Sequence, residues 1–228
     1  MKALSGKRRG RPRNPELAVR RREEILRAAT LVFARVGYGC ADLQDVADDL
    51  GVGKGTLYRY FPTKEALFTA AVDRVMTGMR ESIDGAVLGV GDPLEVIGAA
   101  VRAYLCYFDK HPEYVELLIQ ERAELRDRKT PTYFVHREAN VGRWRAIYAG
   151  LIAAGRMRDI PMDRITDVTS NAIYGAMFVN YFAGRRKSLL EQAEDILDVI
   201  FNGLLTPEEQ ARRTPKGRTA RSEKGGER

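Results

Sequence analysis

The chain has 228 residues, of which 44% are hydrophobic and 30% are charged, and its formal net charge at pH 7 is +7. This length and apolar content allow a buried core in one or two domains, and the positive charge is consistent with a polyanionic partner. The two cysteines lie far apart, no paired Cys/His spacing is present, and no apolar run approaches the ~18 residues of a membrane span. We therefore expect a reduced, cytoplasmic protein without a metal, a cofactor or a membrane partner.

Residues 1–14 are polar and basic, with too little apolar surface to fold alone. They include Arg9-Gly10-Arg11-Pro12, which resembles the core of the AT-hook, an extended element that lays arginines in the minor groove of A·T-rich DNA. A narrow minor groove concentrates negative potential and would attract Arg9 and Arg11. The same residues are equally consistent with a basic tail that binds phosphates without preference, so both alternatives stay open.

A first long helix is predicted from Pro15 to about Val36, because apolar residues recur there at helical spacing. Its apolar stripe comprises Ile25, Ala29, Val32, Phe33 and Val36. Gly37 follows this stripe and is expected to end the helix.

Two short helices joined by a tight turn are predicted next. Asp42 is a good N-cap for the first of them, because its carboxylate can accept from free backbone N–H groups. Gly51 follows the last apolar position of this helix, where a left-handed residue ends a helix at little cost. The second helix begins near Lys54 and is stopped by Pro62. This arrangement is typical of the helix-turn-helix, whose second helix enters the major groove of DNA.

The side chains of the second short helix divide into two groups. Leu57 and Phe61 lie four residues apart and are expected to face the core. The others, with flanking residues, form the candidate DNA-contacting set: Asp42, Lys54, Gly55, Thr56, Tyr58, Arg59, Tyr60 and Lys64. A purely structural helical hairpin would not need this cluster of polar and basic side chains. A phosphate-binding loop is excluded, because Lys54 is followed by Gly55 and not by Ser or Thr.

Residues 51–67 read GVGKGTLYRYFPTKEAL. This stretch resembles the signature of the TetR/AcrR family of transcriptional regulators, which commonly reads G-V-S-K-G-T-L-Y-x-Y-F-x-S-K-E-x-L. The sequence departs from the family pattern at Gly53, where Ser is common, and at Ala41-Asp42, where the family often has a Thr pair. The resemblance implies a ligand-responsive repressor that binds a palindromic operator in double-stranded DNA as a homodimer.

From Thr63 onward the chain is predicted to be helical, with breaks at glycines and prolines. The expected helices cover residues 63–88, 93–109, 113–128, 132–155, 161–183 and 189–204. No β alternation of useful length occurs, so the expected fold class is all-α, with about nine helices. The expected organisation is a disordered basic arm (1–14), a helix-turn-helix domain (15–62), a helical ligand-binding and dimerisation domain (63–205) and a disordered basic tail (206–228).

The last two helices are predicted to pair with a second subunit, as the family resemblance implies. Helix 161–183 has a surface of small residues, Ala172, Gly175, Ala176 and Ala183. Helix 189–204 has an apolar face at helical spacing, formed by Leu190, Ala193, Leu197, Ile200 and Leu204. One such face could also be buried within a single subunit.

The resemblance also implies a pocket for an unknown small-molecule effector, enclosed by the helices between residues 63 and 155. The candidate lining residues in this body are Tyr104, Phe108, Arg122, Phe134, Trp144, Tyr148, Tyr174 and Phe178, with Glu121 and His136 as further polar anchors. Aromatic walls with a few polar groups suit an apolar or aromatic ligand. Aromatic residues at these spacings are also compatible with ordinary core packing.

Three classes of function can be compared. A sequence-specific transcriptional regulator is favoured by the stretch at residues 51–67. An enzyme would need a nucleophile with a base, or paired carboxylates in a cleft, and the chain has two histidines and no nucleophile elbow, phosphate loop or metal cluster. An architectural protein that binds A·T-rich DNA through residues 1–14 is the remaining alternative.

Overall fold

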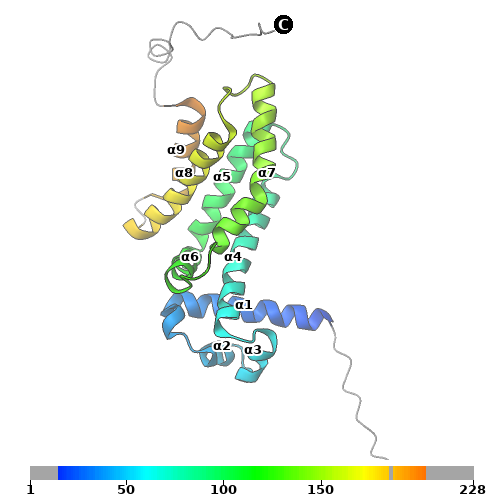
Figure 1. The fold of residues 1–228 in the computed structure, drawn as a ribbon, viewed down its shortest axis with the longest axis vertical. Coiled ribbons are helices and arrows are strands. Elements are labelled where there is room, and N and C mark those ends of the chain that lie inside the picture. Colours follow the sequence, from blue (N-terminus) through cyan, green and yellow to red (C-terminus); the bar gives the residue numbers. More distant parts are fainter. Residues whose placement is uncertain (1–14, 185–186, 204–228) are drawn as a thin grey trace, which may run out of the picture.

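The computed structural model describes residues 15–184 and 187–203, which form nine helices and no strand. Their bounds are α1 (Pro15–Cys40), α2 (Leu43–Asp49), α3 (Lys54–Tyr60), α4 (Lys64–Val87), α5 (Pro93–Lys110), α6 (Pro112–Glu124), α7 (Thr132–Ala153), α8 (Met162–Ala183) and α9 (Leu189–Asn202). Helices α1 to α3 form a small head at one end, and the later helices form an elongated body above it (Figure 1). The predicted all-α fold is confirmed. None of the described helices has both the length and the apolar character needed to cross a membrane.

Local signals determine where the helices of the head begin and end. Asp42 Oδ1 accepts from the backbone N–H of Gln44 at 2.7 Å, and Thr63 Oγ1 accepts from that of Ala66 at 3.0 Å. The predicted N-cap at Asp42 is therefore confirmed, and Thr63 caps α4 in the same way. Gly51 has a φ of 61°, the left-handed conformation expected in the turn between α2 and α3.

Three predicted features of the helices are wrong in detail. Gly37, with a φ of 82°, breaks the helical path of α1, but the chain resumes helical turns as far as Cys40. Val36, beside this break, is 39% exposed and does not belong to the core stripe. Helix α6 ends at Glu124, although the sequence suggested a helix to residue 128.

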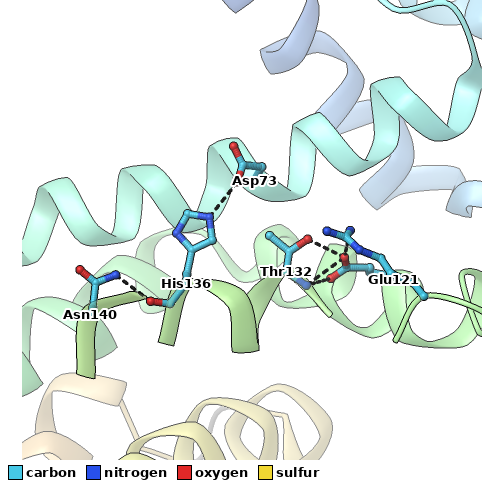
Figure 2. Close-up of polar contacts among 6 residues, drawn as sticks. Asp73, Glu121, Thr132, His136 and Asn140 are labelled. Atoms are coloured by element: carbon cyan, nitrogen blue, oxygen red, sulfur yellow. Dashed lines mark hydrogen bonds and ion pairs between the residues drawn. The ribbon is translucent and has the colours of Figure 1, made fainter. Parts of the chain in front are cut away.

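The early end of α6 is explained by a buried carboxylate. Glu121 is 2% exposed, and its oxygens accept from the backbone N–H of Thr132 at 3.1 Å and from the Thr132 hydroxyl at 2.5 Å (Figure 2). The guanidinium of Arg128 donates to the same carboxylate at 2.5 Å and compensates its charge. These hydrogen bonds hold the first residue of α7 against α6. The chain between the two helices therefore turns, and α6 does not continue to residue 128.

Helix α4 belongs to both the head and the body. At its first turns Leu67 and Phe68 are buried, and the Phe68 ring centroid lies 5.0 Å from that of Phe33 in α1. Farther along, Val75 and Met76 are buried in the body. The helix has 24 residues without a non-helical interruption, a length of about 36 Å at 1.5 Å per residue. No flexible linker therefore separates the head from the body.

A second connection between head and body is polar. Gln120 of α6 is 8% exposed; its Oε1 accepts from the backbone N–H of Tyr38 at 2.9 Å, and its Nε2 donates to the carbonyl of Phe33 at 3.1 Å. Gln120 Nε2 also donates to Glu116 Oε1 at 2.8 Å, and Glu116 Oε2 accepts from the Tyr181 hydroxyl of α8 at 2.5 Å. The bond to Glu116 and burial raise the pKa of Tyr181 to about 12, so its hydroxyl stays protonated and donating at neutral pH. One chain of hydrogen bonds thus runs from α8 through α6 to the break in α1.

Replacing Gln120 with alanine should lower the free energy of unfolding by about 1–3 kcal/mol, because the Tyr38 N–H would lose its acceptor in a poorly hydrated place. Chemical unfolding followed by circular dichroism measures this change. Gln44→Ala is the matched control, since the exposed side chain of Gln44 donates only to Asp48 of its own helix, and this substitution should change stability by less than about 0.5 kcal/mol. Equal losses from the two variants would contradict a stabilising role for the bridge.

Candidate nucleic-acid interface and internal cavity

Helix α3 is held on the head by its two apolar side chains. Leu57 is 0% and Phe61, at the C-cap, is 4% exposed; α3 packs against α2, and the Arg22 guanidinium of α1 lies 5.1 Å from the centroid of the Phe61 ring. Tyr58 and Arg59 lie on the exposed side. Tyr60 is half-buried against the core, and the Arg59 guanidinium lies 5.3 Å from the centroid of its ring. The exposed side of α3 therefore presents a phenol and a guanidinium side by side.

The start of α3 carries an ion pair. Lys54 Nζ donates to Asp42 Oδ1 at 2.6 Å. This bond, with the backbone N–H of Gln44, lowers the pKa of Asp42, and the same bond raises the pKa of Lys54. Both groups are therefore charged at neutral pH and partly neutralise each other. An external anion at Lys54 would therefore compete with Asp42 for the charge of the ammonium group.

The remaining positions of the candidate set lie close to this pair. Thr56 is half-exposed on α3, and a Cβ built on Gly55 would meet no atom within 4 Å, so the backbone there is open. Lys64, at the first position of α4, donates to the carbonyl of Gly39 at 3.1 Å and lies 4.9 Å from the centroid of the Tyr38 ring. Arg9 and Arg11 lie outside the described residues.

A cavity of about 140 Å³ lies in the body between α4, α5, α7 and α8. Three of the predicted lining residues, Tyr104, Trp144 and Tyr148, are found in its wall. Tyr104 and Tyr148 are buried, and burial raises the pKa of both phenols, so both remain neutral. His136, which the sequence suggested as a polar anchor, also lines the cavity.

The other predicted lining residues lie elsewhere, and those expectations are corrected. Phe108 is 1% exposed and packs in the core beside Tyr107. Arg122 is exposed on α6, and Phe134 is 41% exposed on the outer face of α7. Tyr174 and Phe178 stack in an aromatic row along α8, with ring centroids 4.6 Å apart. The Glu121 carboxylate accepts hydrogen bonds from Thr132 and Arg128, as described above.

Polar residues that the sequence analysis did not single out form a further part of the wall. They are Arg80 and Asp84 of α4, Arg137, Asn140 and Arg143 of α7, and Thr166, Thr169 and Ser170 of α8. Positions 136, 140 and 143 of α7 are spaced four and then three residues apart, so they share a helix face. That spacing was the signal in the sequence that could have located them.

Several of these groups connect neighbouring helices. His136 Nε2 lies 2.8 Å from Asp73 Oδ1 of α4, and Asn140 Nδ2 donates to the His136 carbonyl at 2.7 Å (Figure 2). Arg143 of α7 forms a close ion pair with Asp84 of α4. Arg137 donates from a terminal nitrogen to Asp167 of α8 at 2.6 Å. Two polar contacts therefore join α7 to α4 beside the cavity.

Among the described residues, no group of three or more His, Cys, Asp or Glu side chains could hold a metal ion.

Comparisons with known proteins agree on one family. Residues 25–71 match the family of bacterial regulatory proteins named tetR, a segment that runs from the middle of α1 into α4. The HTH-type transcriptional repressor NicS of Pseudomonas putida is 27% identical over 144 residues, which cover 62% of this chain and 68% of NicS. The matched region covers only 40% and 49% of the length of two other curated relatives.

Solved structures share the fold over most of the chain. A TetR/AcrR-family regulator from Thermobifida fusca is 25% identical, with a TM-score of 0.62, and the match covers 82% of this chain and 100% of that one. FadR of Bacillus subtilis, solved in complex with stearoyl-CoA, is 17% identical, with a TM-score of 0.67 and coverage of 80% and 99%. The matching segment therefore places residues 25–71 in the tetR family of bacterial regulatory proteins, and the described chain as a whole has the fold of solved TetR-family regulators.

Proposed function

We propose that the protein is a dimeric DNA-binding regulator, acting as a repressor in the cytoplasm, whose affinity for an operator is controlled by a small molecule in the cavity. The observation that carries this proposal is the course of α4. Its first turns support the head, and Met76, Met79 and Arg80 of the same helix line the cavity. The relative NicS is named a transcriptional repressor, which supports the regulatory role. No enzymatic step is part of the proposal.

Helix α3 is the proposed reading element. Tyr58 and Arg59 are exposed on it and would contact base edges in the major groove, where arginine pairs well with guanine. The open backbone at Gly55 allows close approach to DNA. Lys54 and Lys64, near the starts of α3 and α4, would contact phosphates. Insertion of Arg9 and Arg11 into a flanking minor groove remains a prediction, because these residues lie outside the described part of the chain.

The proposed dimer interface is an exposed apolar stripe on α8. Its members are spaced four, three, four and three residues apart, as in the seam of paired helices, and are Val168, Ala172, Gly175, Val179 and Phe182. Val179 is 64% and Phe182 is 69% exposed in the single chain. A row of apolar side chains left in water favours association with a second copy.

Helix α9 would contribute less of its surface to that interface than the sequence suggested. Ala193 and Leu197 are buried, and Arg102 of α5 binds Glu194 of α9 through two hydrogen bonds of 2.6 and 2.9 Å. The predicted face of α9 is thus partly used within one subunit. Leu190, Val199 and Phe201, which are 41–47% exposed, remain available for the partner.

The proposed control acts through the helices that surround the cavity. A ligand there would contact α4 and α7, which His136 and Asp73 join. Any displacement of α4 moves the head, because Phe68 and Leu67 are packed into its core. A ligand must favour the arrangement with low DNA affinity, and a coupling of about 1–3 kcal/mol would weaken DNA binding by roughly 5–150-fold.

Replacing Tyr58 and Arg59 together with alanine should abolish preference for the operator without unfolding the head, because both side chains are exposed. The operator is obtained by selecting bound fragments from genomic DNA with the unchanged protein, and footprinting should show a short symmetric site. Thr69→Ala, on α4 and outside α3, is the control that should bind normally. Unchanged operator preference in the double variant would contradict the assignment of α3, and diffuse protection of A·T-rich DNA would favour an architectural protein.

Asp42→Asn should strengthen DNA binding. The amide keeps the cap of α2, since Asn and Asp are similar N-caps, but it releases Lys54 and removes a negative charge. The slope of log K against log salt should become steeper by about one phosphate contact. Fluorescence anisotropy across a salt series measures both changes, with Asp48→Asn of the same helix as the control. Weaker binding by Asp42→Asn would mean that the carboxylate itself makes a favourable contact with DNA.

Phe182→Asp should convert the dimer to monomers. The substitution removes the aromatic side chain from both subunits of a twofold interface. Loss of a central aromatic weakens the free energy of association by about 2 kcal/mol or more. Analytical ultracentrifugation should show one chain per particle, and operator affinity should fall with it. Leu88→Asp changes a residue that is 85% exposed outside α8 and α9 and should remain dimeric. A dimeric Phe182→Asp protein would rule out this part of the surface as the interface.

A further inference from the structure

One polar atom in the cavity wall lacks a partner. Of the buried side-chain nitrogen and oxygen atoms in the residues that the structure describes, Arg137 Nε is the one without a hydrogen bond. The same guanidinium donates from a terminal nitrogen to Asp167 at 2.6 Å, which fixes its position. A buried donor on a charged group is costly to leave unpaired. Arg137 lines the cavity, and its buried Nε–H is the donor there that still lacks an acceptor.

The charges around the cavity favour an anion. Three arginines and one aspartate line it, namely Arg80, Arg137, Arg143 and Asp84, and Asp84 is paired with Arg143. Asp167, which pairs with Arg137, is not among the lining residues. His136 adds no negative charge in either protonation state. With Arg137 paired to Asp167 and Arg143 to Asp84, the remaining positive charge of the wall is that of Arg80, and it favours a negatively charged group.

The size and composition of the cavity limit the rest of the ligand. Its volume is about 140 Å³, close to the roughly 150 Å³ that accommodates a benzene ring in a protein interior. Tyr104, Trp144 and Tyr148 provide aromatic surfaces, and Met76, Ile97 and Ile173 provide apolar ones. Aromatic side chains pack well against an aromatic ring, edge to face or offset.

We propose that the ligand of this cavity is a small aromatic carboxylate, with one ring between the apolar walls and a carboxylate that accepts from Arg137 Nε. This inference rests on the proposed function, because it specifies the chemical class of the effector. The carboxylate satisfies the unpaired donor while Asp167 keeps the guanidinium oriented. The ring lies against Met76 of α4, so the occupied cavity contacts the helix that supports the head.

The test uses the full chain and isothermal titration calorimetry with benzoate and phenylacetate, and with the neutral analogue benzamide. At least one of the two acids should bind saturably and at least about tenfold more tightly than benzamide, the difference expected for a hydrogen bond to a charged group. Arg137→Gln should remove this preference. Arg145→Gln is the matched control, because Arg145 also pairs with an aspartate of α8, Asp163, but does not line the cavity.

Loss of folding in Arg137→Gln would be detected by circular dichroism. In that case Arg137→Lys, which keeps the charge but lacks the Nε–H, should also lose the preference. The inference is overturned if neither acid binds, if benzamide binds as tightly, or if Arg145→Gln weakens binding as much as Arg137→Gln. Operator binding measured in parallel separates the two proposals: an acid that binds without changing operator affinity contradicts only the proposed control, and normal operator binding without acid binding contradicts only the ligand class.

Discussion

The fold depends on one constraint, which is that a single uninterrupted helix supports the head and lines the cavity in the body. The buried Leu67 and Phe68 fix α4 in the core of the head, and Met76 and Met79 bring the same helix to the cavity wall. Protein interiors are closely packed, so a rigid helix held at both places transmits displacement instead of absorbing it. Under the proposed control, the contents of the cavity would set the position of α3 through this helix.

Polar contacts between helices provide further connections between the head and the body. The pair of His136 and Asp73 joins α7 to α4 beside the cavity, whereas Gln120 joins α6 to the break at Gly37 in α1. Because Gln120 is also linked through Glu116 to Tyr181 of α8, the head is connected to the helix proposed to bind the partner subunit. Hydrogen bonds of this kind exist in discrete arrangements, and such bistable elements are what a ligand can shift.

The sequence predicted features whose causes are local. Asp42 and Gly51 act on backbone groups within a few residues, so the cap and the turn they form could be read directly. The cavity could not be predicted in the same way, because Tyr104 lines it while Phe108, one turn later on α5, is core. Nor could the bridge between Gln120 and Tyr38, which lie 82 residues apart. Such contacts depend on how helices cross, which composition and spacing do not specify.

The most direct measurement of the central claim is the distance between the two heads of the dimer. Cys40 is exposed at the end of α1 and can carry a spin label, with Cys106 replaced by alanine. Ala100→Phe would fill part of the cavity without any ligand, since Ala100 is in its wall. Pulsed electron paramagnetic resonance should then show a changed distance between the two labels. Operator binding by the same protein should be weaker. A folded, dimeric Ala100→Phe protein with weaker operator binding and an unchanged distance would contradict the account.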